Sequence, residues 1–321
     1  MIPADGIPDL APVPTRTLVH ALVREDGTVD AGELYTVAGL LGMTDQQVRL
    51  CLKRLVAEGR FTHEGRGRKA VLRAVADATG AIAPDAAHVR LAYRQDHGLA
   101  PWDGVWHLFA FAVPESERAA RDALRDTLLH LGAAPLHGGL YVCAHPIEPL
   151  VEARAEELGV AASLTCLTST DLSIGGVAEP RALAASLWPL DGIAARHDAL
   201  AAFAGSCLER LERLERGDRP DRPERSDRLE GTDGPDGPDG PDRPEPLTSA
   251  ERLSLAIRLA AAFSYAMTPD PLLPAELLPQ PWPGTRARHL MATAWAALVQ
   301  HAPDDSAPLP RLFVLYEDFA G

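Results

Sequence analysis

The side chains best suited to chemistry gather in one short stretch of the sequence, residues 44–73. Eight basic residues fall there against three acidic ones, a net charge of +5, whereas the whole chain carries −14. Both lysines of the protein, Lys53 and Lys69, lie in this stretch. Cations at this density suit a phosphate backbone, so the pattern favours local contact with nucleic acid. The negative charge of the whole chain disfavours indiscriminate binding by its entire surface.

Spacing predicts that the stretch begins with a helix. Thr44 is suited to the N-cap, Gln47 can close a capping box with it, and Gly59 is placed to end the helix. The predicted buried side consists of the apolar residues at helical spacing, Val48, Cys51, Leu52, Leu55 and Val56. Glutamine and arginine can each make paired hydrogen bonds to a base edge. The DNA contacts expected from this helix are Thr44, Gln46, Gln47, Arg49, Lys53 and Arg54.

A basic hairpin is predicted after the helix, with extended arms over residues 60–63 and 70–75. Its tip holds two glycines that permit a turn. We expect Arg66, Arg68 and Lys69 at the tip to grip the phosphate backbone.

Two further helices are predicted upstream, from Thr15 and over residues 30–41, with a short break at Gly42. Helix, helix, short turn, helix, hairpin is the order of a winged helix-turn-helix, here over residues 15–80. The alternative is that the charged helix face is only a solvated surface. The basic excess, the short turn and the Arg/Gly tip coincide, which favours DNA contact.

The following part of the chain predicts an α+β domain. A connecting helix is expected within residues 81–100. Over residues 101–178, strands alternate with helices, and a short extra strand is expected near residues 133–136. This order is typical of a ferredoxin-like sandwich, whose helices cover one face of the sheet and leave the other for a partner. The predicted fold class of the whole chain is therefore α+β.

The C-terminal third predicts helices around a low-complexity segment. Residues 179–215 read as helical, and residues 216–246 contain three tandem Asp-Gly-Pro units among prolines and charges. Such a composition cannot bury a core, so this segment is predicted to be a disordered linker. Residues 247–321 predict an α-helical domain, for which we hypothesise a dimer surface.

Composition argues against several kinds of site and of cellular location. The four cysteines, at positions 51, 143, 166 and 207, form no close pair, which argues against a zinc site and a disulfide framework. No apolar run has membrane-spanning length, and the N-terminus lacks the features of a signal peptide. We therefore expect a cytoplasmic protein without membrane contact, cofactor or metal.

A set of short motifs, taken in order, resembles a known family. The motifs comprise Leu41 and Gly42; Val48, Arg49, Arg54 and Leu55; residues 65–68; Trp102, Asp103, Gly104 and Trp106; Pro114, Arg118, Arg121, Leu124 and Arg125; Leu131 and Gly132; Gly139 and Leu140; Leu187, Trp188 and Leu190; residues 277–279 and residues 282–284. Their order resembles that of the PaaX-like transcriptional regulators. Two departures are Val71, where family members often carry an aromatic residue, and the Asp-Gly-Pro linker.

The resemblance implies a GntR-like winged helix, a Cas2-like ferredoxin middle domain and an α-helical C-terminal domain. It also implies a homodimer on a palindromic double-stranded DNA operator. The regulator would repress aromatic or phenylacetate catabolic genes and would be released by an aryl-CoA such as phenylacetyl-CoA.

An acyl-CoA effector needs cations for its phosphates and an apolar pocket for its acyl group. Arg118, Arg121 and Arg125 recur at helical spacing and are the candidates. The alternative is that they are exposed arginines paired with neighbouring carboxylates, Glu115, Glu117 or Asp122.

Two other classes of function compete with a DNA-binding regulator. A Cas2-like domain suggests a metal-dependent nuclease, with Asp103 as the residue to nominate, although its Trp-Asp-Gly-Val-Trp setting is more typical of a turn. The 11 histidines show no metal-ligand spacing on one helix, so we predict no catalytic residue and no metal site. The other class is a regulator that acts only through protein partners, which would lack the steep salt dependence of DNA binding.

Overall fold

The computed structural model describes residues 13–24, 26–65, 67–75, 86–216 and 247–300. The predicted linker therefore lies almost wholly outside the described residues. Those residues form two compact units, each assembled from separated segments of the chain. The first unit contains the described residues of 1–79, 202–259 and 292–320, and the second those of 80–201 and 260–291.

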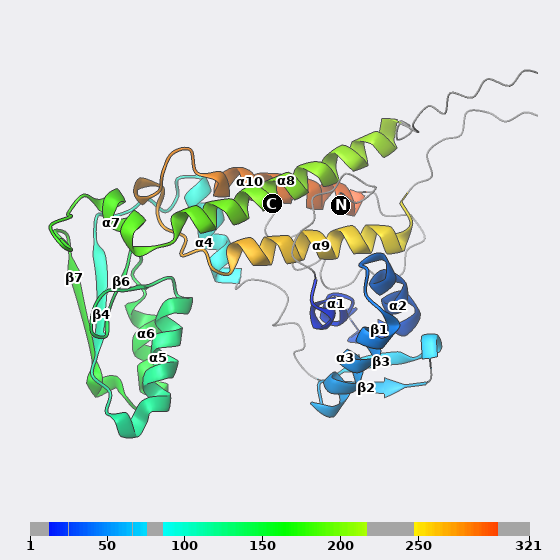
Figure 1. Cartoon of the computed structure of the whole chain (residues 1–321), viewed down its shortest axis with the longest axis horizontal. Coiled ribbons are helices and arrows are strands. Elements are labelled where there is room, and N and C mark those ends of the chain that lie inside the picture. The colour runs from blue at the N-terminus through cyan, green and yellow to red at the C-terminus, as the bar shows by residue number, and fades with distance from the viewer. Residues whose placement is uncertain (1–12, 25, 66, 76–85, 217–246, 301–321) are drawn as a thin grey trace, which may run out of the picture. The chain divides into compact units, whose positions relative to one another are not determined.

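The N-terminal part of the first unit consists of three helices and a small sheet (Figure 1). Its elements are, in order, α1 (Thr15–Ala21), β1 (Thr28–Asp30), α2 (Ala31–Leu40), α3 (Asp45–Ala57), β2 (Phe61–Glu64) and β3 (Val71–Ala74). The strands pair antiparallel in the order β1-β3-β2, with Thr28 opposite Arg73 and Phe61 opposite Ala74. The helices and the hairpin that the sequence predicts are thus all present.

The apolar stripe of α3 is narrower than the sequence predicts. Val48, Leu52 and Leu55 are buried, but Cys51 is only half-buried and Val56 is 39% exposed. At 100° per residue the three buried positions define one line along the helix, and the other two fall on its flanks. More of the surface of α3 therefore faces solvent than predicted.

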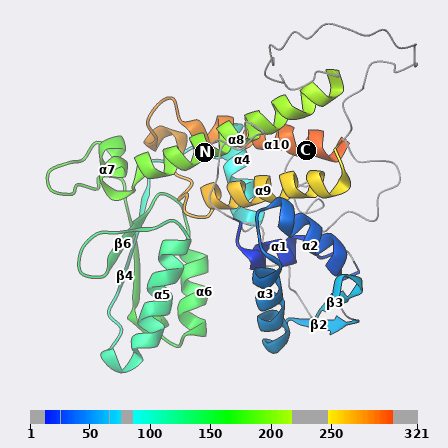
Figure 2. The ribbon, with the colours of Figure 1, turned by 45° about the vertical axis from the view of Figure 1, so that its right-hand side comes forward.

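The second unit is built around a four-stranded sheet. Its elements are, in order, α4 (Ala86–Asp96), β4 (Trp106–Phe111), α5 (Arg118–His130), β5 (Ala134–Pro135), β6 (Leu140–Cys143), α6 (Glu148–Glu157), β7 (Leu164–Ser169) and α7 (Pro180–Leu187). The strands are antiparallel in the order β5-β6-β4-β7. Helices α5 and α6 lie side by side on one face of the sheet in both views (Figure 1 and Figure 2). This is the ferredoxin-like arrangement that the sequence predicts.

The alternation of side chains along β4 explains how both faces of this sheet are covered. Phe109 points to α5 and α6 and belongs to the core there. Trp106 and Leu108 point to the other face, where they belong to one buried cluster with Leu183 and Trp188. The rings of Trp106 and Trp188 are stacked with centroids 6.3 Å apart. The prediction that this face is left for a partner is therefore wrong at the Trp106 end of the sheet.

Three long helices complete the described chain, α8 (Leu190–Arg216), α9 (Ser249–Met267) and α10 (Pro283–Gln300), and each contributes residues to both units. Within the first unit, the guanidinium of Arg258 lies over the ring of Phe203 at 5.0 Å. Within the second unit, Arg196 lies over the ring of Tyr265 at 4.7 Å. Helices α8 and α9 are thus joined by an arginine on an aromatic ring in each unit. No described helix is long and apolar enough to cross a membrane.

Candidate nucleic-acid interface

The break between α2 and α3 depends on one glycine. Gly42 adopts a φ of 74°, a left-handed conformation that costs glycine little. This lets the Met43 N–H donate a hydrogen bond back to the Ala38 carbonyl at 2.9 Å, which closes α2. Helix α3 then begins at Asp45, so the two helices are joined by a short, fixed turn.

A capping box fixes the first turn of α3. The backbone N–H of Gln47 donates to the Thr44 hydroxyl at 3.2 Å, and the backbone N–H of Thr44 donates to the Gln47 side-chain oxygen at 2.8 Å. These side chains satisfy backbone groups that would otherwise lack partners. Thr44 and Gln47, both predicted to contact DNA, thus also stabilise the N-terminus of α3.

The outward face of α3 carries cations without acidic partners. Gln46, Arg49 and Lys53 are all exposed. Within the described residues, neither Arg49 nor Lys53 makes an ion pair or a side-chain hydrogen bond. In contrast, Arg16 of α1 pairs with Glu58, at the C-terminal end of α3, at 2.9 Å. A guanidinium and an ammonium left unpaired on one exposed helix face can bind an anionic partner.

Arg54 lies on a different side of α3 from Arg49. It lines a hollow of about 320 Å³ that α3 shares with Thr15 and Arg16 of α1. Gln47 lines the same hollow. The structure thus divides the predicted helix contacts between the outward face and the side turned toward α1.

The hairpin turns one of its predicted cations back onto the helices. The guanidinium of Arg68 lies 4.0 Å from the carboxylate of Asp45 and 5.7 Å from the ring centroid of Tyr35. A Cβ at Gly32 in α2 would meet the Arg68 carbonyl at 3.0 Å, so the hairpin turn packs closely against this helix. Lys69 is exposed, and Arg66 lies outside the described residues. The Arg68 side chain thus lies beside α2 and the first turn of α3 but is 63% exposed, and its contact with DNA stays a prediction.

Leu50 is absent from the predicted contacts, yet it is 49% exposed. It lies between the outward face and the hollow that Gln47 and Arg54 line, and it contributes to that hollow. The signal was available, because a buried line through Val48, Leu52 and Leu55 places residue 50 on the opposite side. A methyl-bearing side chain at this position can contact the C5-methyl group of thymine.

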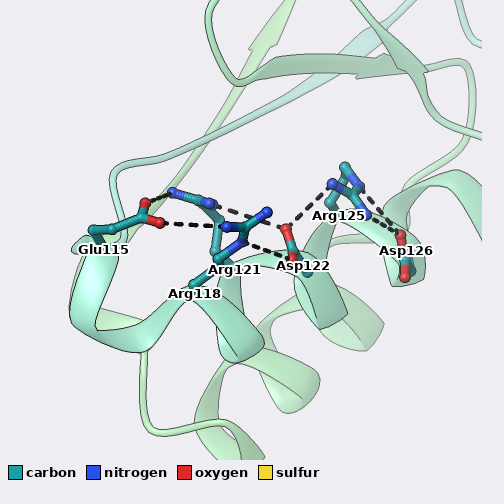
Figure 3. A network of polar contacts seen from close by, with 6 residues as sticks. All are labelled: Glu115, Arg118, Arg121, Asp122, Arg125 and Asp126. Atoms are coloured by element: carbon teal, nitrogen blue, oxygen red, sulfur yellow. Dashed lines mark hydrogen bonds and ion pairs between the residues drawn. The ribbon is translucent and has the colours of Figure 1, made fainter.

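The three arginines proposed to bind an effector differ from Arg49 and Lys53, because each lies next to a carboxylate (Figure 3). Arg121 lies 2.7 Å from Glu115, Arg125 lies 2.9 Å from Asp126, and Arg118 lies 3.6 Å from Asp122. Hydrogen bonding to Asp126 raises the pKa of Arg125, so its charge is held in the local network. This is the alternative arrangement that the sequence allows, and binding of an effector here stays a prediction.

Asp103 occupies a turn. Its carboxylate accepts a hydrogen bond from the Val105 N–H at 2.9 Å, and Gly104 adopts a φ of 82°. The side chain thus shapes the entry to β4. In the part of the chain that the structure describes, no three histidine, cysteine, aspartate or glutamate side chains converge as metal ligands.

Comparisons with known proteins give two family matches. The PaaX protein central Cas2-like domain matches residues 99–184. The PaaX-like protein C-terminal domain matches residues 241–304. None of the curated proteins is significantly similar to the chain. The solved structure of the uncharacterized protein Rv0674 from Mycobacterium tuberculosis is 20% identical, and the match covers 91% of this chain and 97% of that one with a TM-score of 0.45.

Proposed function

Since the chain belongs to the PaaX-like family, whose members are generally transcriptional regulators, we propose that it is a sequence-specific DNA-binding regulator. Residues 15–80 would form its winged helix-turn-helix, with α3 in the major groove and the β2–β3 hairpin as the wing. The order α1-β1-α2-α3-β2-β3 and the sheet order β1-β3-β2 support this assignment.

One observation carries the proposal: α3 exposes unpaired cations in a chain with a net charge of −14. The exposed arginines of α5, in contrast, lie next to carboxylates. Arg49 and Lys53 have no such explanation within the described residues. A polyanion that fits one helix face, such as the duplex backbone and its major groove, is the partner that this charge pattern suits.

The exposed residues of α3 and of the hairpin would have different roles in DNA recognition. Gln46 and Arg49 would read base edges, because each can make paired hydrogen bonds. Lys53 and Lys69 would neutralise phosphates and thereby set the position of the protein without selecting sequence. Leu50 would contact a thymine methyl group.

The finer parts of the proposal come from the family resemblance. A PaaX-like regulator would act as a homodimeric repressor on a palindromic operator of aromatic or phenylacetate catabolic genes. An aryl-CoA would release it. Arg118, Arg121 and Arg125 would bind the effector only if its phosphates replaced the carboxylates that these arginines contact.

Selection from a pool of random DNA duplexes by the purified full chain tests the proposal. Enriched duplexes should share a motif and should bind on the order of 10³-fold more tightly than a scrambled duplex at physiological salt. A pool that yields no shared motif would show that the chain is not a sequence-specific DNA-binding protein.

Replacing each thymine of the selected motif by uracil, which removes only the methyl group, tests the role of Leu50. One replacement should weaken binding by wild type and leave binding by Leu50→Ala unchanged. Leu40, which is 51% exposed on α2, offers the matched control. The role of Leu50 would be rejected if every thymine position behaved alike in both proteins.

A further inference from the structure

A second candidate site lies in the other unit, well apart in sequence from α3. A cavity of about 190 Å³, partly open to solvent, is lined by α4, the end of α5, the start of α6 and the residues that follow α9. Its walls are mainly apolar and include Leu91, Leu131, Ile147, Leu150, Pro271 and Leu272. The cavity is larger than the engineered apolar cavity of about 150 Å³ that binds benzene. It is therefore large enough for one aromatic ring.

The polar side chains that line the cavity are those of His88, His130, His145 and Thr268. Among the described residues, no lysine, arginine, aspartate or glutamate lines it. Burial lowers the pKa of His145, so this imidazole is uncharged near neutral pH. Its Nε2 donates to the Leu272 carbonyl at 2.7 Å, which leaves Nδ1 as an acceptor. These walls suit an uncharged apolar ligand.

Leu272, in the wall of this cavity, has a strained backbone. Its φ of 51° is the one positive φ of a non-glycine residue in the described parts of the chain. Its carbonyl accepts hydrogen bonds from Gln95 of α4 and from His145, both at 2.7 Å, and its N–H donates to Asp270 at 2.8 Å. Strained residues persist only where their surroundings hold them, and they cluster at ligand sites and switches.

The partners of Leu272 are themselves fixed. The second carboxylate oxygen of Asp270 lies 2.7 Å from His197 Nε2 in a pair that is almost fully buried. Asp96, next to Gln95 on α4, makes a two-pronged contact with Arg288, with both distances 2.6 Å. Asp270 and α4 are thus both held in place by other contacts. A shift of the Leu272 backbone would therefore alter its hydrogen bonds to these fixed groups, and the hydrogen bond from Gln95 connects it to α4.

We propose that this cavity binds an uncharged apolar group of the size of one aromatic ring. Occupancy would press on the Leu272 side chain, shift its strained backbone and alter the hydrogen bond to Gln95 at the end of α4. The site would thus couple ligand binding to the helix that follows the N-terminal elements in the chain. This inference does not depend on DNA binding.

Fluorobenzene is a suitable probe, followed by ¹⁹F NMR titration against the full chain. Ala87→Phe enlarges an exposed residue of the lining and should weaken binding roughly tenfold, the equivalent of about 1.4 kcal/mol. Leu150→Ala removes part of the wall and should weaken binding several-fold. Leu129→Ala is the matched control, because Leu129 is also exposed but does not line the cavity. Equal affinity in all four proteins, or no saturable binding by wild type, would overturn the site.

Hydrogen exchange of the α4 amides tests the coupling. Saturating fluorobenzene should change exchange over residues 86–96 in wild type, and the change should be lost in Gln95→Leu, which cannot donate to Leu272. If α4 exchanged at the same rate with and without the probe while the probe bound, the coupling through Leu272 would be refuted.

Discussion

Helices α3 and α5 both carry basic residues at helical spacing, yet their surroundings are opposite. On α5 and the turn before it, three arginines pair with three carboxylates, those of Glu115, Asp122 and Asp126, at distances of 2.7 to 3.9 Å. On α3, Arg49 and Lys53 are exposed with no acidic partner in the described residues. Spacing of cations alone therefore does not identify an anion site. The charge of the neighbouring side chains decides whether a cation is available to a partner.

The largest expected effect is on DNA recognition by Arg49. Arg49→Ala should weaken binding to the selected duplex by roughly 10- to 100-fold, because a paired contact to a base is worth about 1–3 kcal/mol. It should also relax preference at one base pair. Fluorescence anisotropy measures both, and Arg121→Ala is the matched control that should stay within about twofold of wild type. Equal losses in the two variants would remove the distinction between α3 and α5.

The next effect is on stability. Thr44→Ala deletes the hydroxyl that accepts from the Gln47 N–H and should lower the free energy of unfolding by about 1 kcal/mol. Thr127→Ala on α5 is the control, because its hydroxyl bonds only to the Ala123 carbonyl within the helix. Denaturant titration followed by circular dichroism measures the free energy of unfolding of both variants, and Thr44→Ala should lose more than Thr127→Ala. A cap that matters only for DNA would leave the unfolding curve of Thr44→Ala unchanged.

Lys53→Ala separates phosphate contact from base reading. It should weaken binding to all duplexes alike and reduce the slope of log K against log salt by about 0.9, the value for one phosphate contact. Arg49→Ala should instead change which sequences are preferred. A shift in sequence preference with Lys53→Ala would reverse the roles assigned to these two residues.

The smallest effect should come from α5. Arg118→Ala removes exposed contacts at 3.6 and 3.8 Å and should change the free energy of unfolding by less than about 0.5 kcal/mol. Denaturant titration at low and at high salt measures it. A loss of several kcal/mol would mean that this network has a structural role that its exposure does not suggest.

These two helices also show what the sequence could predict. The capping box of α3 follows from Thr44 and Gln47, and the glycine that ends it follows from Gly59, because both are local signals. The alternation along β4 likewise predicts a strand. Local patterns did not reveal that Leu183 and Trp188, far along the chain, cover the second face of the sheet.

The candidate sites were less predictable, because they depend on long-range contacts. The position of Arg68 against Tyr35 and Asp45 arises from the packing of the hairpin turn on α2, which spacing does not encode. The cavity near Leu272 combines segments that are more than a hundred residues apart. The exposure of Leu50, in contrast, could have been read from the helical period.

The most direct test uses two variants with the same net charge, Arg49→Glu/Lys53→Glu on α3 and Arg118→Glu/Arg121→Glu on α5. Their affinities for the selected duplex are compared over a range of salt concentrations. The α3 variant should lose about 100-fold or more in affinity, with a shallower salt slope, and the α5 variant should lose no more than a few-fold. Equal losses would show that net charge, and not the exposed face of α3, governs binding, which would contradict the central claim.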